Sequence, residues 1–328
     1  MRNRKPPFEI TNTSIAAVAE IAERIGALTA RNGVADPVLR RTNRIRTIQG
    51  SLSIEQNTLS LEQVTAVLNG KQVLAPPKDI AEVKNAYDIY ERLDELDPYS
   101  SDDLLKAHAV LMCGLVEECG VFRTKNVGVA DASGRILHFG TLPDYVPGLV
   151  AELLDWVRTS DVHILIKSCV FHYEFELIHP FADGNGRLGR LWHTLLLSQW
   201  NGAFAYLPVE SVIAARQAEY YAAINAANEV GESTPFIEFM LSTILASLNE
   251  ALDVSDEMSD GTPGRTARRR AQIERYLEAH EYIANADVRA LCGVSAATAN
   301  RILADMAGDG TIVRCRRGGH WAYRKEKV

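Results

Sequence analysis

Thirteen residues near the middle of the chain combine side-chain types that handle phosphate: Ile178-His179-Pro180-Phe181-Ala182-Asp183-Gly184-Asn185-Gly186-Arg187-Leu188-Gly189-Arg190. The apolar run before them should be a helix that ends at His179-Pro180, because proline cannot continue the hydrogen-bond ladder and disfavours helix at the residue before it. The glycines that follow allow a tight loop in which backbone N–H groups converge. A second helix starting near Arg187 adds its positive N-terminus, so the sequence predicts an anion hole.

The charged residues of this stretch complete a site for a polyphosphate. Arg187 and Arg190 are three residues apart on the second helix and therefore occupy neighbouring surface positions over the predicted hole. Asp183 offers one oxygen ligand, which is how Mg²⁺ is commonly held, with waters and substrate phosphates completing its coordination. His179 stands at the start of the loop, where a group that titrates near neutral pH can accept a proton from an attacking hydroxyl.

The string from His179 to Arg190 resembles the motif of the Fic family, His-Pro-Phe-x-Asp-Gly-Asn-Gly-Arg-x-x-Arg, at every fixed position. The resemblance implies a mostly α-helical domain that transfers AMP from ATP to a protein hydroxyl and releases pyrophosphate. It also implies roles for the residues: His179 as general base, Asp183 as the ligand of Mg²⁺ or Mn²⁺, Gly184, Asn185 and Gly186 as the anion hole, and Arg187 and Arg190 as holders of the β- and γ-phosphates. Gly186 argues against the relatives that phosphorylate their target, which have a lysine in its place.

A second motif lies before the core, in Ser51-Leu-Ser-Ile-Glu55-Gln56-Asn57. By pattern alone this is the end of an amphipathic helix. Beside a Fic core it resembles the inhibitory helix of the family, Ser/Thr-x-x-x-Glu-Gly/Asn-Asn, at Ser51, Glu55 and Asn57. The resemblance implies that Glu55 pairs with Arg190 and places a negative charge where the γ-phosphate belongs. Gln56 departs from the pattern, and since glutamine adopts left-handed conformations poorly, we expect the turn after Glu55 to differ.

The composition is that of an ordinary globular protein, with 328 residues, 47% hydrophobic and 23% charged. No stretch approaches the roughly 18 consecutive apolar residues of a membrane span. The basic start of the chain leads into no apolar signal core, so export is not expected. Five cysteines are scattered and odd in number, which favours reduced thiols in a cytoplasm.

The net charge of −7 hides an asymmetry between the two ends of the chain. From Thr262 onward there are 13 Lys/Arg and 7 Asp/Glu, whereas the residues before it have 22 and 35. The order of predicted elements there, with helices over 268–280, 285–291 and 295–307 and strands over 311–315 and 320–324, resembles a winged helix with a basic hairpin. Winged helices bind DNA but also dock proteins and form dimers, and the basic balance favours DNA.

Helical periodicity and capping residues predict most of the remaining elements. We expect residues up to about Thr13 to be loosely attached. Helices are expected from Ser14 to about 32, from Pro37 towards Glu55, from Ser60 to 69, over 79–96, from a Ser101 cap to Glu117, and over 144–159, 163–178, 217–228 and from Thr234 onward. Two β-prone runs over 127–138, around a turn at 131–134, predict a hairpin. In Fic proteins such a hairpin follows a Phe-Arg pair, here Phe122-Arg123, and aligns the target by adding its backbone as a strand.

Three further residues, Tyr221, Asn228 and His172, are candidates for a role in the site or in the core beside it. By resemblance to a Tyr-Tyr pair and a later asparagine that flank adenine in the family, Tyr221 and Asn228 are candidate contacts of the nucleotide base. His172 lies on the apolar helix before the motif, where packing in the core is the favoured role.

The sequence therefore predicts a mostly α protein, with a Fic-fold helical core, a β-hairpin flap and a C-terminal winged helix-turn-helix domain. The expected domains are an N-terminal segment (1–33), the Fic domain (34–252, with the inhibitory helix at about 37–57), a linker (253–264) and the winged helix (265–328). The expected partners are ATP, a target protein hydroxyl that the chain itself can supply, DNA, and a second copy in a homodimer, with no membrane. Two alternatives stay open: a hydrolase that removes AMP from modified protein, and a DNA-binding regulator that uses the Fic domain as a nucleotide sensor.

Overall fold

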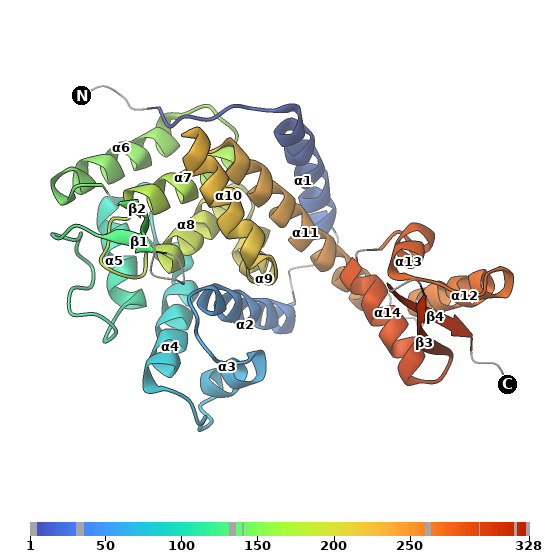
Figure 1. Ribbon diagram of the computed structural model, residues 1–328. Coiled ribbons are helices and arrows are strands. Elements are labelled where there is room, and N and C mark those ends of the chain that lie inside the picture. The colour runs from blue at the N-terminus through green and yellow to red at the C-terminus, as the bar shows by residue number, and fades with distance from the viewer. Residues whose placement is uncertain are drawn as a thin grey trace. The chain divides into compact units, whose positions relative to one another are not determined.

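The computed structural model describes residues 5–30, 36–130, 136–139, 141–259, 264–294, 296–317 and 320–325. Contacts divide the chain into two compact units, one within residues 1–25 and 34–245 and the other within 26–33 and 246–328. The described part of the first unit is helical apart from one hairpin (Figure 1). Of the described helices, none is long and apolar enough to cross a membrane.

The first unit contains the first part of α1 (Asn12–Ala30), then α2 (Pro37–Ile54), α3 (Leu61–Leu68), α4 (Pro77–Glu91), α5 (Ser101–Leu111), α6 (Val146–Thr159), α7 (Ile164–Ile178), α8 (Asn185–Trp200), α9 (Val209–Ala215), α10 (Gln217–Val230) and the first part of α11 (Thr234–Ser259). Turns of 3₁₀ helix cover Leu93–Glu95, Pro143–Tyr145 and Gly202–Tyr206. Strands β1 (Gly128–Ala130) and β2 (Ile136–Phe139) pair antiparallel, with Val129 opposite His138. The turn expected at 131–134 lies outside the described residues.

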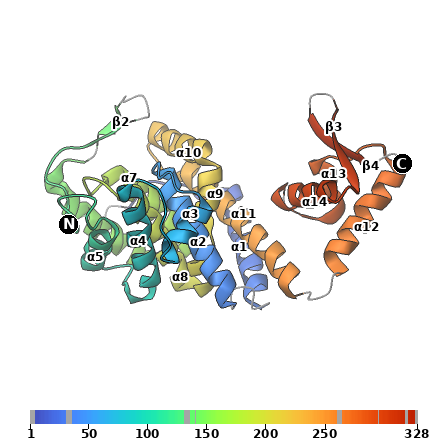
Figure 2. The ribbon, with the colours of Figure 1, turned by 90° about the horizontal axis from the view of Figure 1, so that it is seen from below.

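The centre of the first unit is the pair α7 and α8. A helix that is apolar around most of its circumference is buried on all sides, and Cys169, Phe171 and Phe175 of α7 are fully buried. Leu191 and Trp192 of α8 pack into the same core. Helices α6, α5 and α2 contact this pair, and Figures 1 and 2 show α7 and α8 enclosed by their neighbours. The motif connects the two most enclosed helices.

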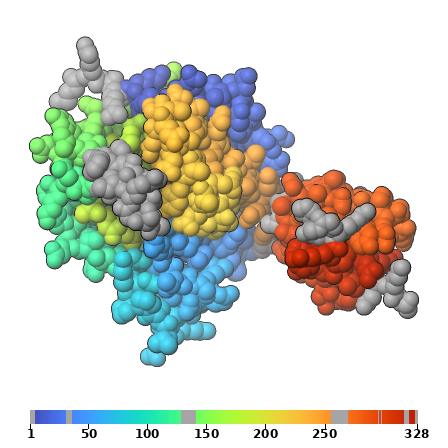
Figure 3. Space-filling view, viewed as in Figure 1, coloured from blue at the N-terminus to red at the C-terminus, as the bar shows by residue number. Residues whose placement is uncertain are grey.

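Helix α2 approaches the core closely because it carries a glycine at the contact. A Cβ atom on Gly50 would lie 2.7 Å from the backbone carbon of Glu210 in α9, so a larger residue would push the helices apart. On the surface, α2 to α4 lie on the same face of the unit as α10 (blue to cyan and yellow in Figure 3). This packing fixes the body of α2 beside the loop between α7 and α8.

Local capping explains where several helices begin, and it corrects one expectation. Asp36 accepts a hydrogen bond from the Val38 amide at the start of α2, and Ser60 forms a capping box with Gln63 at the start of α3. Helix α5, however, is capped by Ser100 and not by Ser101.

Helix α5 also ends at Leu111, six residues before the expected Glu117. The Asn85 side chain donates hydrogen bonds to the carbonyl oxygens of Leu111 and Cys113. Gly114 follows with a φ of +71°. Both features favour an end to the helix at this point.

The described residues before α1 are not loosely attached, contrary to the expectation. The Glu9 amide donates to Thr234 Oγ1 (2.8 Å), and Thr11 Oγ1 donates to Glu238 (2.6 Å). Thr11 also caps α1, which begins at Asn12 and not at Ser14. Hydrogen bonds to distant residues, which local patterns do not reveal, hold this segment.

The second unit contains α12 (Gly264–Ala279), α13 (Asn285–Cys292), α14 (Ala296–Gly308) and the antiparallel strands β3 (Ile312–Arg317) and β4 (His320–Lys325). An isolated bridge between Ile283 and Tyr323 pairs a third segment of the backbone with this hairpin. Ile273, Val288, Leu303 and Met306 pack into a core of their own. Thus the unit has helix, helix, helix and hairpin in the expected order, and Gly293 ends α13 with a φ of +64°.

The linker expected at 253–264 is partly helical. Helix α11 continues to Ser259, and the Asp253 carboxylate accepts a hydrogen bond from Thr298 (2.7 Å). Residues 260–263, which carry the Gly and Pro of this segment, lie outside the described residues, and α12 begins at Gly264. Polar residues do not by themselves end a helix, so the polar composition of 253–259 is compatible with the continuation of α11.

Candidate active site

The loop between α7 and α8 is formed by two residues with positive φ. His179 ends α7 in the left-handed region (φ 51°, ψ 63°), and Gly184 precedes α8 with a φ of 84°. A Cβ atom on Gly184 would lie 2.6 Å from the Met112 sulfur, so glycine is needed there for space as well as for conformation. The side chain of Asn185 closes the loop by donating to Phe181 O and accepting from Phe181 N, both at 2.9 Å.

This loop forms the floor of a pocket of about 580 Å³. Its lining includes Glu55, Glu176, His179, Asp183, Gly184, Asn185, Gly186, Arg190, Tyr220, Tyr221 and Asn228. A Cβ atom on Gly186 would collide with the Glu55 carboxylate, so this glycine also gives the ion pair its room. The pocket therefore gathers the loop of the motif, the end of α2 and one face of α10.

Arg190 is the most buried charged group of the pocket, with a side chain 1% exposed. Its Nη2 lies 2.8 Å from Glu55 Oε1 and 2.9 Å from the Ser51 carbonyl, and its Nε donates to Ser51 Oγ (3.0 Å). Burial is the largest single influence and would lower the pKa of Arg190, but Glu55, Tyr220 and Glu176 together raise it. The ion pair that the resemblance implies between the two motifs is present in the structure.

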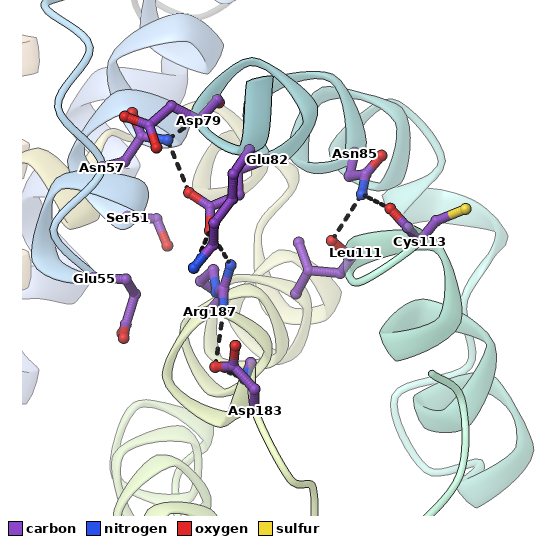
Figure 4. A network of polar contacts seen from close by, with 12 residues as sticks. Ser51, Glu55, Asn57, Asp79, Glu82, Asn85, Leu111, Cys113, Asp183 and Arg187 are labelled. Carbon is purple, nitrogen blue, oxygen red and sulfur yellow. Dashed lines mark hydrogen bonds and ion pairs between the residues drawn. The ribbon is translucent and has the colours of Figure 1, made fainter. Parts of the chain in front are cut away.

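Arg187 is also buried but points away from the pocket. Its Nη1 donates to Glu82 of α4 (2.9 Å) and its Nη2 to Asp183 Oδ1 (3.0 Å), as Figure 4 shows. Arg190 is part of the described pocket lining, whereas Arg187 is not.

Asn57, the last of the three inhibitory candidates, does not contact Arg190, because its Nδ2 donates to Glu82 (2.8 Å). The three inhibitory candidates therefore make different contacts, and only Ser51 and Glu55 contact Arg190.

His179 is oriented through its Nδ1 atom. That nitrogen lies 3.3 Å from the Glu176 carbonyl oxygen and 3.8 Å from Glu176 Oε2. A proton on Nδ1, donated to the carbonyl, leaves the lone pair on Nε2, which is the arrangement a general base needs. The side chain is partly exposed in the pocket, so the geometry suits proton transfer to His179 from a bound hydroxyl.

Arg123, which the sequence marks only as part of the Phe122-Arg123 pair before the hairpin, makes several contacts at the site. Its guanidinium is buried and donates to the carbonyl oxygens of His179 (2.6 Å), Ile178 (3.3 Å), Lys125 (2.9 Å) and Thr141. One side chain thus binds the end of α7 and both ends of the hairpin. The Phe-Arg pair was the available signal, but the partners of a buried arginine are set by tertiary structure.

Glu176 is a second residue of the pocket that was not predicted from the sequence. It lies one turn before His179, and its Oε1 has no hydrogen-bond partner among the described residues. Burial first, and the charge of Glu55 second, raise the pKa of Glu176 to about 7, with Arg190 acting in the opposite direction. A carboxyl group in an apolar helix beside a catalytic histidine candidate was the signal in the sequence.

The candidate base contacts lie on α10 and line the pocket. Tyr221 is 44% exposed, and its ring centroid is 5.4 Å from that of the buried Tyr220. Asn228 Oδ1 accepts a hydrogen bond from the Tyr173 hydroxyl (2.9 Å). His172 is fully buried behind them and contacts Tyr220, and burial lowers its pKa well below the usual value. The core position expected for His172 is what the structure has.

Asp183 is the residue that fits a metal ion. Its side chain is 49% exposed, and its Oδ1 accepts hydrogen bonds from the Gly184 amide and from Arg187. No cluster of three or more metal-binding side chains exists among the described residues. A single accessible carboxylate suits Mg²⁺, which keeps several waters and is held mainly by substrate phosphates.

The turn after Glu55 has the geometry of a glycine-type helix end, although the residue there is glutamine. The amide of Asn57 donates to the Leu52 carbonyl and that of Gln56 to the Ser53 carbonyl, which is the Schellman pattern. Gln56 has a φ of 67°. The expectation that glutamine would divert this turn is wrong, because the flanking contacts of Glu55 and Asn57 hold the chain in the left-handed conformation.

A helical domain with a glycine loop at a helix N-terminus, a histidine at the loop start and a buried arginine over the pocket has the features of an anion-binding site. The model of the Fic/DOC family matches residues 98–197, which contain the motif and the hairpin. A solved Fic family protein from Desulfovibrio desulfuricans is 42% identical, with a TM-score of 0.74 and coverage of 99% of each chain. The chain belongs to the Fic family.

Curated relatives match a larger share of the chain than the family model does. The protein adenylyltransferase fic-1 of Caenorhabditis elegans is 32% identical over 223 residues, or 64% of this chain and 41% of its own length. The protein adenylyltransferase Fic of Nematostella vectensis is 29% identical over 59% of this chain and 45% of its own. The chain spans less than half the length of these two relatives.

The positive φ of Gln56 yields a prediction about stability. Replacing Gln56 with glycine should raise the free energy of unfolding by about 0.5–1 kcal/mol, because glycine avoids the cost of about 1–2 kcal/mol that a side chain meets in this conformation but adds backbone entropy to the unfolded chain. Gln56→Ala keeps the Cβ atom and should give no such gain. Urea unfolding followed by tryptophan fluorescence measures both variants, and equal effects of glycine and alanine would rule out relief of φ strain.

Glu176 predicts a pH dependence of stability. Its pKa is about 4.5 in the unfolded chain and about 7 in the fold, so the stabilisation is complete below pH 4.5 and is lost as pH rises through 7. Between pH 5 and 7.5 the wild type should therefore lose about 1–3 kcal/mol relative to Glu176→Gln, whose amide does not titrate. Urea unfolding at both pH values tests this, with the exposed Glu117→Gln as control. Parallel pH profiles for wild type and Glu176→Gln would contradict the assignment.

Proposed function

We propose that the chain is a protein adenylyltransferase that transfers AMP from ATP to a hydroxyl of a target protein and is held inactive by Glu55. The observation that carries this proposal is the ion pair of Arg190 with Glu55 inside the pocket that also contains His179. The curated names of the relatives support the reaction class. The proposed Fic domain is residues 34–252, and the five free thiols suit a cytoplasm.

In the proposed reaction, the target hydroxyl oxygen attacks the α-phosphorus of ATP and pyrophosphate leaves. His179 Nε2 takes the hydroxyl proton as the new oxygen–phosphorus bond forms. The amides of the loop at Gly184 to Gly186 and the start of α8 stabilise the phosphate oxygens. Arg190 holds the γ-phosphate, and Arg187 supports the β-phosphate from behind the loop.

Asp183 would hold Mg²⁺ or Mn²⁺, and the ion would neutralise part of the charge of the nucleotide phosphates. Tyr221 and Asn228, at the open side of the pocket, would contact the adenine base. The hairpin β1–β2 would align the target by accepting its backbone as an added strand. Arg123 binds both hairpin ends and the His179 carbonyl, which suits a geometry in which the target hydroxyl reaches the base.

Inhibition follows from competition for Arg190. With Glu55 in place, the guanidinium is already paired and a carboxylate stands where the γ-phosphate would bind. A charge-assisted contact contributes about 1.5–3 kcal/mol, which is a factor of about ten to over a hundred in ATP binding. Self-modification is one route for the activity, and a homodimer would provide the second copy.

For the second unit we propose a winged helix, residues 265–328, that binds DNA. The hairpin exposes Trp321, and the guanidinium carbons of Arg314 and Arg316 lie 3.8 and 4.8 Å from its ring centroid. Cations held over an exposed aromatic ring suit contact with a phosphate backbone. The basic balance of this part of the chain supports the same partner.

The central prediction concerns Glu55. Glu55→Gly should raise AMP transfer by about ten- to a hundredfold, because Arg190 becomes available to the γ-phosphate. Glu55→Asp should raise it less, since its shorter side chain still carries the charge. Incubation of each variant with ATP, with intact-mass analysis of the protein and of cellular proteins and an assay of released pyrophosphate, measures the change.

Two controls separate the readings of this experiment. Arg190→Ala in the Glu55→Gly protein should abolish transfer, and His179→Ala should abolish it while ATP binding persists, because the anion hole remains. If Glu55→Gly instead loses the ability to remove AMP from a modified protein, the carboxylate positions water and the chain is a hydrolase. If it changes neither reaction, the nucleotide-sensor alternative gains.

DNA binding by the second unit predicts a steep salt dependence. Affinity for a mixed-sequence duplex should fall as salt rises because phosphate contacts release counterions. In the full chain, Arg314→Ala with Arg316→Ala should weaken binding and reduce the slope of log K against log salt by about two. Arg92→Ala, an exposed arginine of the first unit, serves as control. Equal affinity of the double variant and the control, or no binding by any form, would favour docking or dimerisation.

A further inference from the structure

Glu82 of α4 is a buried carboxylate to which the proposed chemistry assigns no role. Its side chain is 4% exposed. Oε1 lies 2.9 Å from Arg187 Nη1, and Oε2 lies 2.8 Å from Asn57 Nδ2, as Figure 4 shows. Lys78 is 3.9 Å from Oε1 but is itself largely exposed. The two oxygens thus bind two different parts of the chain, the end of the inhibitory segment and the helix of the motif.

Both of these neighbours are hydrogen-bond donors, which makes a carboxylate the required group. A carboxylate presents two acceptor oxygens, whereas an amide of the same shape presents one acceptor and one NH₂. At this position an amide would satisfy either Asn57 or Arg187 and direct an N–H at the other. The site therefore specifies glutamate by chemistry and not only by shape.

Each oxygen continues into a longer chain of contacts. On one side Arg187 also donates to Asp183, the residue that fits a metal ion (3.0 Å). On the other side Asn57 accepts from the Leu59 amide and closes the last turn of α2 through its own amide, directly after Glu55 and Gln56. Glu82 therefore joins the segment that carries Glu55 to the arginine and the carboxylate of the motif.

The surroundings on α4 reinforce this connection. Asp79, Glu82 and Asn85 recur every three residues and lie on one side of the helix. Asp79 accepts hydrogen bonds from the amide and hydroxyl of Thr58. Asn85 holds the end of α5, whose Met112 packs against Gly184. This polar row contacts the inhibitory segment at one end and the support of the anion loop at the other.

We propose that Glu82 is a positioning residue with two separable functions, which rests on the proposed function: Oε1 orients Arg187 and Asp183 for the nucleotide, and Oε2 anchors Asn57 and thereby keeps Glu55 on Arg190. The first function supports activity and the second supports inhibition. Glu82 touches neither the pocket interior nor a reacting atom, so its effects must pass through Arg187 and Asn57.

The first test measures ATP binding in a protein freed from inhibition and unable to turn over, Glu55→Gly with His179→Ala. Isothermal calorimetry with ATP and MgCl₂ should show that adding Glu82→Gln raises Kd about tenfold or more, because Arg187 loses its charged partner. Adding Asn57→Ala should leave Kd within about twofold, because this background lacks the Glu55 carboxylate that Asn57 is proposed to keep on Arg190. Equal Kd values with and without Glu82→Gln would overturn the orienting function.

The second test uses the chain with Glu55 intact and does not alter Glu82. Asn57→Ala should raise basal AMP transfer by about two- to tenfold, the worth of one net hydrogen bond. Asn57→Asp should raise it more, because it places an acceptor against Glu82 Oε2 and the Asp79 carbonyl. Unchanged transfer in both would overturn the anchoring function. Asn57 is partly exposed, so these variants stay informative even where Glu82→Gln does not fold.

The outcome can be told apart from failure of the proposed function. If the Glu55→Gly protein binds ATP but transfers no AMP, the proposed reaction is wrong, while the calorimetric comparison still tests Glu82. In that case ATP binding to the Glu55-containing Asn57 variants replaces transfer as the second readout. Thermal melting of each variant shows whether a change in Kd reflects loss of the fold.

Discussion

A guanidinium that is almost completely buried needs a negative partner, and Arg190 meets this need with Glu55. Without a partner, the buried guanidinium would carry a large desolvation cost that no other interaction offsets. The site is therefore built for an anion at this position, and the resting chain supplies the anion itself. In the proposed reaction, the desolvation that would make Arg190 a strong phosphate ligand is the same property that makes Glu55 an effective partner.

The rest of the site depends on keeping the backbone close to this ion pair. His179 and Gly184 turn the chain through two left-handed residues, and Gly186 leaves room for the Glu55 carboxylate. Asn185 closes the loop with two bonds to Phe181, so its side chain shapes the loop instead of facing the ligand. The close approach of neighbouring atoms therefore restricts which residue types the motif can contain, independently of their chemical roles.

Much of this arrangement could be predicted from the sequence, because local signals carried it. Capping residues located α2 and α3, and the resemblance of two linear motifs to those of the Fic family predicted the contact of Glu55 with Arg190. The partners of Arg123 and Glu82 could not be predicted, since they come from residues far along the chain. Gln56 shows the converse limit: its own preference argued against a left-handed turn, yet tertiary contacts on both sides impose one.

The three contacts between Arg190 and α2 differ in how firmly they are held. Ser51 lies in the body of the helix, which Gly50 packs against α9, and it binds Nε and Nη2 of the arginine. Glu55 lies at the last turn, with a side chain 32% exposed. In the proposed mechanism, inhibition would be released by movement at the helix end without displacement of α2. Ser51 can keep the guanidinium oriented during that exchange, so a phosphate that replaces Glu55 meets an arginine already in place.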